Sequence, residues 1–251
     1  MTAGFKDLFS PQAADYRRHR PGYPAALFEY LASLPKTRRL ALDCATGNGQ
    51  AAVGLAAHFD RVLAVDLSRG QLDNAVPHPK VGYRLAAAED TGLPAGSADL
   101  VASASGMHWF DLGRFYTEVR RVAAPGGVLA AWCYGRDLRI TPEVDAIVER
   151  YAFELLGPYW EPEIKHVYAD YKTLPFPFDE LAPPAFELDE EWDLSRLAGD
   201  LSTWSSARRY REERGTDPFT LVASALEGAW GPPERVRRVR WGICMRVGRV
   251  S

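Results

Sequence analysis

The sequence predicts an α/β fold with a doubly wound, mainly parallel β-sheet. Between residues 38 and 134, short apolar runs alternate with segments of helical periodicity. This pattern is typical of a parallel sheet that is covered by helices on both faces. A turn of small residues follows the first apolar run, and an acidic residue ends the second. The chain of 251 residues can bury a full core, so we expect one domain with an insertion.

Five apolar runs are the expected parallel strands. They cover residues 40–43, 61–66, 81–87, 98–104 and 127–133. The clearest helix spans residues 112–122, because Phe115, Val119 and Val122 recur at helical spacing. The Pro-Gly-Gly sequence that follows ends this helix before the fifth strand.

The pattern changes after residue 134. A helix over residues 142–156 precedes a stretch, residues 157–184, that is rich in proline and aromatic side chains. Proline argues against a central strand there, while the aromatic rings provide apolar surface to bury. The composition fits either a lid over a cleft or a segment that pads the edge of the sheet. Residues 239–247 alternate between apolar and basic or small side chains, which predicts a final strand.

Charge and hydropathy indicate the class of partner. The net charge is −3, and the arginines of residues 235–249 follow the alternation of the final strand, which is more typical of a solvated strand face than of a nucleic-acid surface. No apolar run approaches the roughly 20 residues of a membrane helix. Residues 1–20 are polar and aromatic and do not resemble a signal peptide. We expect a cytoplasmic protein that binds a small molecule, without nucleic acid or membrane.

Neither a disulfide framework nor a metal site is expected. Cys44, Cys133 and Cys244 are widely spaced inside apolar, strand-like runs, which predicts reduced, buried thiols. The five histidines form no pair at metal-ligand spacing and have no neighbouring cysteines.

A candidate ligand-binding loop, residues 43–49, joins the first strand to an Ala-rich helix. Its sequence is Asp-Cys-Ala-Thr-Gly-Asn-Gly. Gly47 and Gly49 allow the backbone to pass close to a ligand, and the helix that follows directs free N–H groups toward it. Asp66 ends the second strand, where a carboxylate can accept hydrogen bonds from ribose hydroxyls. Alternatively, Asp66 caps the helix that starts near Ser68.

Two cofactor classes share this geometry. Gly47, Gly49 and Ala52 fit a dinucleotide fingerprint. Asp43 separates the two classes, because its carboxylate would repel a pyrophosphate but could bind backbone N–H groups or, through water, an ammonium group of the ligand. S-adenosylmethionine (SAM) has that ammonium and no phosphate, so SAM is the expected cofactor.

The loop resembles the D-x-G-x-G-x-G loop of class I SAM-dependent methyltransferases, with Ala45 in place of the first glycine. Residues 88–94 and 97–101 resemble the acidic, Leu-Pro and fourth-strand segments of that family, although Ala87 replaces its usual aspartate. This resemblance implies a seven-stranded sheet with an antiparallel C-terminal strand and a lid formed by a helical and loop insertion. It divides the chain into a lid segment at about 5–35, a nucleotide-binding core at 36–134, an insertion at 135–184 and a C-terminal completion of the sheet at 185–251.

Residues 9–24 and 107–111 are similar to the methyltransferase type 11 branch that includes the trans-aconitate methyltransferases. In that branch the N-terminal segment closes over SAM, which implies that Tyr16 and Arg20 reach the cofactor carboxylate. The loop and the resemblance together imply the cofactor-binding residues Tyr16, Arg20, Asp43, Ala45, Gly47, Gly49, Asp66, Leu67, Ala88, Glu89 and Ser105.

Methyl transfer from a sulfonium is an in-line displacement, so the protein has mainly to align the reactants and exclude water. A carboxylate acceptor needs no base, whereas a phenol or an amine benefits from one. His108, at the end of the fourth strand, is the candidate catalytic base, or it only orients the next helix. O-methylation of a small molecule, with a carboxylate as one acceptor, is the expected reaction.

Two other functions remain as alternatives to a methyltransferase: an NAD(P)-dependent oxidoreductase and a SAM-binding protein without catalytic activity. Tyr168 and Lys172 have the Y-x-x-x-K spacing of NAD(P)-dependent reductases, but they lie in the proline-rich stretch. Ala45 and Ala87 would also suit a protein that binds SAM without catalysis.

Overall fold

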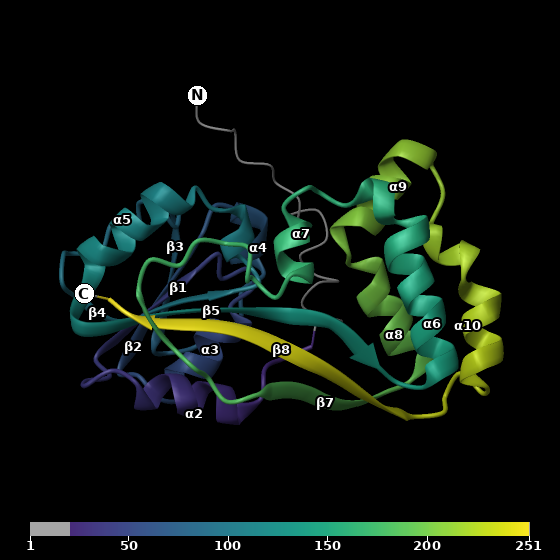
Figure 1. Cartoon of the computed structure of the whole chain (residues 1–251), viewed down its shortest axis with the longest axis horizontal. Helices are drawn as coiled ribbons and strands as arrows, with labels where there is room; N and C mark the ends of the chain where they lie inside the picture. The colour runs from purple at the N-terminus through teal and green to yellow at the C-terminus, as the bar shows by residue number, and fades with distance from the viewer. Residues whose placement is uncertain (1–20, 251) are drawn as a thin grey trace.

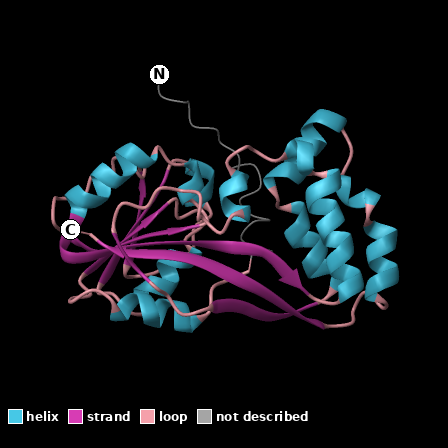
Figure 2. Ribbon diagram, in the orientation of Figure 1, coloured by secondary structure: helices cyan, strands magenta, loops and turns pink. Residues whose placement is uncertain are grey.

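The computed structural model describes residues 21–250. Within this part of the chain, a single mixed sheet carries helices on both faces (Figure 1, Figure 2). Its strands are β1 (Leu40–Cys44), β2 (Arg61–Asp66), β3 (Val81–Leu85), β4 (Ala98–Ala104), β5 (Ala123–Arg139), β6 (Asp179–Leu181), β7 (Phe186–Trp192) and β8 (Arg237–Arg249).

The strand order is β3-β2-β1-β4-β5-β8-β6, and β7 also pairs with β8. Strands β1 to β5 are parallel, and β8 runs antiparallel to β5. Strand β6 pairs with the end of β8, as Leu181 does with Val247, while β7 pairs with its beginning, as Trp192 does with Arg237. The doubly wound, mainly parallel fold is confirmed. The seventh position of the sheet is shared by two short strands, which gives eight strands in the described residues.

Both faces of the sheet are buried, as the continuous apolar runs predict. On β5, Val128, Ala130 and Trp132 pack on the face covered by α2 (Ala25–Ser33) and α3 (Gln50–Ala56). The intervening Leu129, Ala131 and Cys133 pack on the opposite face, against α5 (Leu112–Val122).

Strands β5, β8 and β7 extend past the parallel core and carry four helices (Figure 1). These helices are α6 (Pro142–Arg150), α8 (Leu194–Ser202), α9 (Ser205–Arg214) and α10 (Ala223–Trp230), which we call the helical cap. A π-helical turn, Tyr151–Leu155, continues α6, so the helix expected over residues 142–156 is present with a wider last turn. The short helix α7 (Ile164–Tyr168) lies between the cap and the core (Figure 1).

Strand β5 is longer than expected. It begins at Ala123 and ends at Arg139, inside the expected insertion. The reason is its partner, because β8 pairs with it as far as Arg139↔Arg240, across an irregularity between Tyr134 and Leu138.

The proline-rich stretch was expected either to cover a cleft or to pad the edge of the sheet. Its first half lies beside a cavity, and its second half packs at the sheet. Trp160 and Tyr168 line a cavity beside the cap, whereas Phe178 packs edge-on against Tyr116 of α5, with 5.2 Å between ring centroids. The edge strand β6 follows at Asp179–Leu181, which agrees with the exclusion of proline from central strands.

No helix within residues 21–250 is both long enough and apolar enough to cross a membrane.

Candidate functional site

The loop at residues 43–49 lies at the carboxyl end of β1, where the strand order changes direction between β1 and β4. In open parallel sheets, ligands bind in the crevice at such a point. The backbone takes positive φ at Ala45 (54°), Gly47 (56°) and Gly49 (87°). A Cβ at Gly49 would collide with the Tyr83 hydroxyl, which is held by a hydrogen bond to the Val76 carbonyl. Glycine is therefore required at this position.

Asp66 fixes the loop from the neighbouring strand. Its Oδ2 accepts a hydrogen bond from the Gly47 N–H at 2.8 Å, and its Oδ1 accepts one from the Ser68 N–H at 2.8 Å. The cap of α4 (Arg69–Asp73) is Ser68, whose hydroxyl accepts from the Gln71 N–H at 3.1 Å. The helix cap is therefore assigned to Ser68 and not to Asp66. Asp66 is half-buried, and its predicted contact with ribose hydroxyls stays a prediction.

Asp43 is fully buried beside the loop. Its Oδ2 accepts a hydrogen bond from the Thr46 hydroxyl at 2.6 Å, while its Oδ1 has no hydrogen-bond partner among the described residues. Burial raises the pKa of Asp43 to about 7, against the opposing effect of the Thr46 hydrogen bond, and the negative charge of Asp66 raises it further. A buried carboxylate oxygen without a donor fits a ligand that brings a positive charge to the loop.

The segment after β3 lies at the same edge of the parallel sheet as the glycine loop. Ala88 is buried, and Leu67, next to Asp66, keeps 42% of its surface exposed. Glu89 is half-buried, and its Oε1 accepts a hydrogen bond from the Asp111 N–H at 2.9 Å, at the start of α5. Apolar side chains at these positions suit the faces of an adenine ring, and Glu89 is already held in place by α5.

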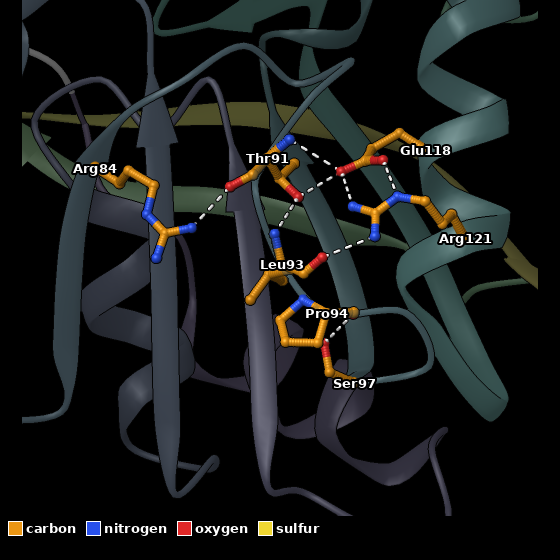
Figure 3. A network of polar contacts seen from close by, with 7 residues as sticks. All are labelled: Arg84, Thr91, Leu93, Pro94, Ser97, Glu118 and Arg121. Carbon is orange, nitrogen blue, oxygen red and sulfur yellow. Dashed lines mark hydrogen bonds and ion pairs between the residues drawn. The ribbon is translucent and has the colours of Figure 1, made fainter.

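A polar network below this segment holds it to α5 (Figure 3). Glu118 Oε1 accepts from the Thr91 N–H at 2.9 Å and from its hydroxyl at 2.6 Å. The Arg121 guanidinium donates to both Glu118 oxygens at 2.7 Å and to the Leu93 carbonyl at 2.8 Å. Burial alone raises the pKa of Glu118, but the hydrogen bonds from Arg121 and Thr91 outweigh it, and the pKa is lowered.

The turn after β4 contacts the glycine loop. Ser105 has φ 54°, and its N–H donates to the Trp132 carbonyl at 2.7 Å. A Cβ at Gly106 would lie 2.7 Å from the Ala45 Cβ, so the two turns are packed as closely as their backbones allow. Ser105 also lines the cavity beside the helical cap.

His108 is buried, with Nδ1 at 2.9 Å from the Tyr171 hydroxyl. Burial lowers its pKa to about 3, with a smaller contribution from His166. His108 is therefore neutral at physiological pH and is a weak base. It is also absent from the described lining of the cavity. Its catalytic role stays a prediction. Because Nδ1 is hydrogen-bonded to Tyr171, Nε2 is the ring nitrogen that would act as the base.

The cavity has a volume of about 490 Å³, which is within the range of small-molecule sites. It lies between the carboxyl ends of β4 and β5, α6 and α7. Trp204 and Ser205, where α8 meets α9, and Trp241 of β8 also line it.

Comparisons with known proteins identify the family. A family model described as a methyltransferase domain matches residues 42–131. A Dictyostelium discoideum protein named as a methyltransferase is 36% identical over 230 residues, which cover 90% of this chain and 87% of that protein. The chain belongs to the class I SAM-dependent methyltransferases. A methyltransferase of Aspergillus terreus is 29% identical over 63% of this chain and 52% of its own length.

Solved structures agree with this assignment. A structure from Anaeromyxobacter dehalogenans, described as a type II methyltransferase, has a TM-score of 0.85 and 50% identity, and the match covers 92% of this chain and 98% of that one. A methyltransferase-type structure from Bacillus halodurans, at 19% identity and a TM-score of 0.50, shares the fold.

The structure of this methyltransferase shows where the expected site residues, the reductase-like motif and the cysteines lie. The eight expected site residues from Asp43 to Glu89, together with Ser105 and His108, lie at the carboxyl ends of β1 to β4 or directly after them. Tyr16 and Arg20 fall outside the described residues. Lys172 of the reductase-like motif is 77% exposed and is paired with Asp170. No cluster of metal-ligating side chains occurs within residues 21–250. The three cysteines are free, and Cys244 is only half-buried, because it lies at the edge of the sheet core.

Sequence reasoning missed the far walls of the cavity. Trp204 and Trp241 come from the C-terminal part of the chain, which showed only the patterns of ordinary core residues. The partner of His108 was missed as well, since Tyr171 reaches it from a turn in which Asp170 and Tyr171 both take positive φ.

Proposed function

We propose that this methyltransferase transfers the methyl group of SAM to a small-molecule acceptor, with SAM in the crevice at residues 43–49 and the acceptor in the neighbouring cavity. The observation that carries the proposal is the contact between these two sites. Ser105 lines the cavity, and Gly106, the next residue, packs against Ala45 of the glycine loop. An acceptor in the cavity would therefore meet the cofactor at this turn, as in-line displacement requires.

The residues around the crevice fit SAM. When bound, the cofactor supplies an electrophilic methyl group. We assign the ribose hydroxyls to Asp66, the neighbourhood of the ammonium group to Asp43, and the adenine ring to Leu67, Ala88 and Glu89. Gly47, Gly49 and Ala45 form the backbone surface on which the cofactor lies. Contacts of Tyr16 and Arg20 with the cofactor carboxylate, and closure of the N-terminal segment over it, stay predictions.

The finer expectation, O-methylation with a carboxylate as one acceptor, also stays a prediction. Its test is the identification of the methylated product. Two arginines on the basic face of β8 form ion pairs within the protein, Arg238 with Asp189 and Arg246 with Glu180. These ion pairs support the expectation that the protein does not bind nucleic acid.

Calorimetry tests the cofactor. SAM and its demethylated product, S-adenosylhomocysteine, should bind, and NAD and NADP should not, because Asp43 and Asp66 repel phosphate groups. Incubation with methyl-labelled SAM and candidate acceptors should then label a small molecule. Binding of nicotinamide cofactors without binding of SAM would contradict the proposal. Binding of SAM without transfer to any acceptor would favour a non-catalytic SAM-binding protein.

A further inference from the structure

The cavity beside the helical cap differs in chemistry from the cofactor crevice. Its lining includes seven aromatic side chains, six of which form two groups of packed rings. Phe153 and Trp160 both pack edge-on against Tyr168, with ring centroids at 4.8 and 6.0 Å, and Trp160 also contacts Trp204 at 5.6 Å. The second group is the pair Tyr134 and Trp241, whose centroids are 4.8 Å apart.

Three indole N–H groups of this lining are used within the protein. Trp160 donates to the Ala152 carbonyl at 2.8 Å, Trp241 to the Gly135 carbonyl at 2.7 Å, and Trp204 to Asp200 at 3.2 Å. These three side chains therefore offer ring surface to a ligand and not hydrogen-bond donors. Surfaces of this kind recognise flat apolar groups by stacking and by burial of apolar area.

The cations of the described lining are also engaged. Arg136 pairs with Glu149 at 2.8 Å and lies over the Phe153 ring at 4.1 Å, and Arg139 pairs with Glu187 at 3.0 Å. The side chains of Arg136 and Glu149 are 54% and 63% exposed, which places this pair at the mouth of the cavity. A carboxylate that entered the cavity would be desolvated without gaining a free cation from the lining that the structure describes, and this costs binding free energy.

Acidic groups of the lining are engaged as well. Asp145 Oδ1 accepts from the Ile140 N–H at 2.7 Å, and Asp137 lies 3.8 Å from Arg139. An ammonium group would compete with these existing partners at the solvated mouth. The remaining wall, toward Ser105, consists of Trp109, Cys133 and Tyr134, none of which carries a charge at neutral pH.

We propose that the cavity binds an uncharged aromatic acceptor, which is selected by the aromatic lining and not by a charged anchor. This inference rests on the proposed function, because the cavity is an acceptor site only if SAM occupies the adjoining crevice. It narrows the acceptor to an aromatic ring that bears a neutral nucleophile, such as a phenol, and it disfavours the carboxylate that the sequence left open.

Three probes that share a naphthalene ring system and differ in charge test the proposal. 2-Naphthol, 2-naphthoate and 2-naphthylmethylammonium are titrated by calorimetry into the protein saturated with S-adenosylhomocysteine. We expect 2-naphthol to bind about tenfold or more tightly than either ion, because only the ions must be desolvated without a free counter-charge. Equal or tighter binding of either ion, or no measurable binding of 2-naphthol, would overturn the proposal.

A blocking variant locates the binding. Ile164 of α7 lines the cavity and is half-buried, so Ile164→Trp should fill the cavity and weaken 2-naphthol binding about tenfold or more. The matched control is Leu221→Trp, because Leu221 is 53% exposed and outside the described lining. It should leave binding unchanged. Equal binding of 2-naphthol to wild type and Ile164→Trp would place the ring elsewhere and refute the assignment.

The two proposals fail in different ways. Both variants should bind S-adenosylhomocysteine as wild type does, because neither position touches residues 43–49. If the wild-type protein does not bind S-adenosylhomocysteine, the proposed function is wrong. If it binds S-adenosylhomocysteine and prefers 2-naphthoate, the function stands and the inference about the acceptor is wrong.

Discussion

At the scale of single residues, two carboxylates hold the cofactor loop in different ways. Asp66 uses both oxygens to bind backbone N–H groups on either side of the crevice, at Gly47 and Ser68. Asp43 instead binds one hydroxyl and keeps one oxygen without a hydrogen-bond partner in the described structure. The first carboxylate orders the loop, while burial raises the pKa of the second to about 7, so a ligand that brings a positive charge would favour its ionised form.

Asp66→Ala should weaken binding of S-adenosylhomocysteine about tenfold or more, because it removes charge-assisted hydrogen bonds to the ribose and to the loop. Asp66→Asn should cost less, since its amide oxygen can still accept one of the two N–H groups. Calorimetry measures both. Asp73→Ala, an exposed carboxylate at the end of α4, is the control and should bind as wild type does. Wild-type affinity in both Asp66 variants would remove Asp66 from the binding site.

Asp43 should make stability depend on pH. Its pKa is raised from 3.8 to about 7 in the folded protein, so the folded state binds the extra proton between these values. The stabilisation is complete below the unfolded pKa and is lost as pH rises through the folded pKa, by up to about 1.4 kcal/mol per pH unit.

Urea unfolding at several pH values tests this dependence. The difference in unfolding free energy between wild type and Asp43→Asn should fall from pH 5 to pH 7 and become constant above about pH 8, because asparagine does not titrate. A difference that does not change over this range would show that Asp43 is ionised in the folded protein.

The positions of the candidate site residues in the fold could be predicted where the signal was local, whereas their roles stay predictions. Asp43, Gly47 and Asp66 lie at strand ends, and the period and length of each strand determine where it ends. The surroundings of His108 could not be predicted, because its hydrogen-bond partner Tyr171 is 63 residues away in sequence. No pattern in the chain relates the two positions, and the burial that makes this histidine a weak base depends on that packing.

At the scale of elements, the segment after β3 is shaped by α5 and not by its own sequence. Leu93 packs in the core, but the backbone of residues 91–93 is held by Glu118 and Arg121, two positions one helical turn apart on α5 (Figure 3). The boundaries of the elements are likewise set by contacts with other elements. Strand β5 continues to Arg139 because β8 offers it a partner, and only the paired structure contains this information.

Glu118→Gln should lower the free energy of unfolding by about 1–3 kcal/mol, because the amide nitrogen replaces an acceptor and faces the Arg121 guanidinium. Its lowered pKa gives the sign of the pH dependence, since the stabilisation is present above the unfolded pKa and is lost on acidification. Urea unfolding of wild type and variant measures the change. Glu149→Gln breaks an ion pair with both partners more than half exposed, and it should cost less than about 1 kcal/mol. Equal effects of the two substitutions would contradict the role of the network.

At the scale of the whole molecule, the parallel half of the fold was predictable and the helical cap was not. Runs buried on both faces, such as residues 98–104, identify central strands by composition alone. The cap is assembled from α6 and from α8 to α10, which are separated in sequence by the stretch around α7 and by β6 and β7. Their helical periodicity identifies the elements, but the packing of these elements over β5 and β8 comes from long-range contacts.

These long-range contacts join the cap and the cofactor half into one core. A single cluster of buried residues includes Leu55 of α3, Trp132 of β5, Leu197 of α8 and Trp230 of α10. Strands β5 and β8 run through both halves (Figure 2). We therefore expect the two halves to unfold in one transition, as most continuous cores do.

The distribution of tryptophan makes this expectation testable. The seven tryptophans all lie at or after Trp109, five of them in or around the helical cap, whereas S-adenosylhomocysteine should bind mainly between residues 43 and 89. Free ligand at about 100 times its Kd should raise the free energy of unfolding by about 2.7 kcal/mol. If the halves unfold together, urea unfolding followed by tryptophan fluorescence and by far-ultraviolet circular dichroism should show one coincident midpoint, which the ligand shifts equally in both signals. A fluorescence midpoint that stays in place while the dichroism midpoint moves would show instead that the cap unfolds independently of the cofactor site.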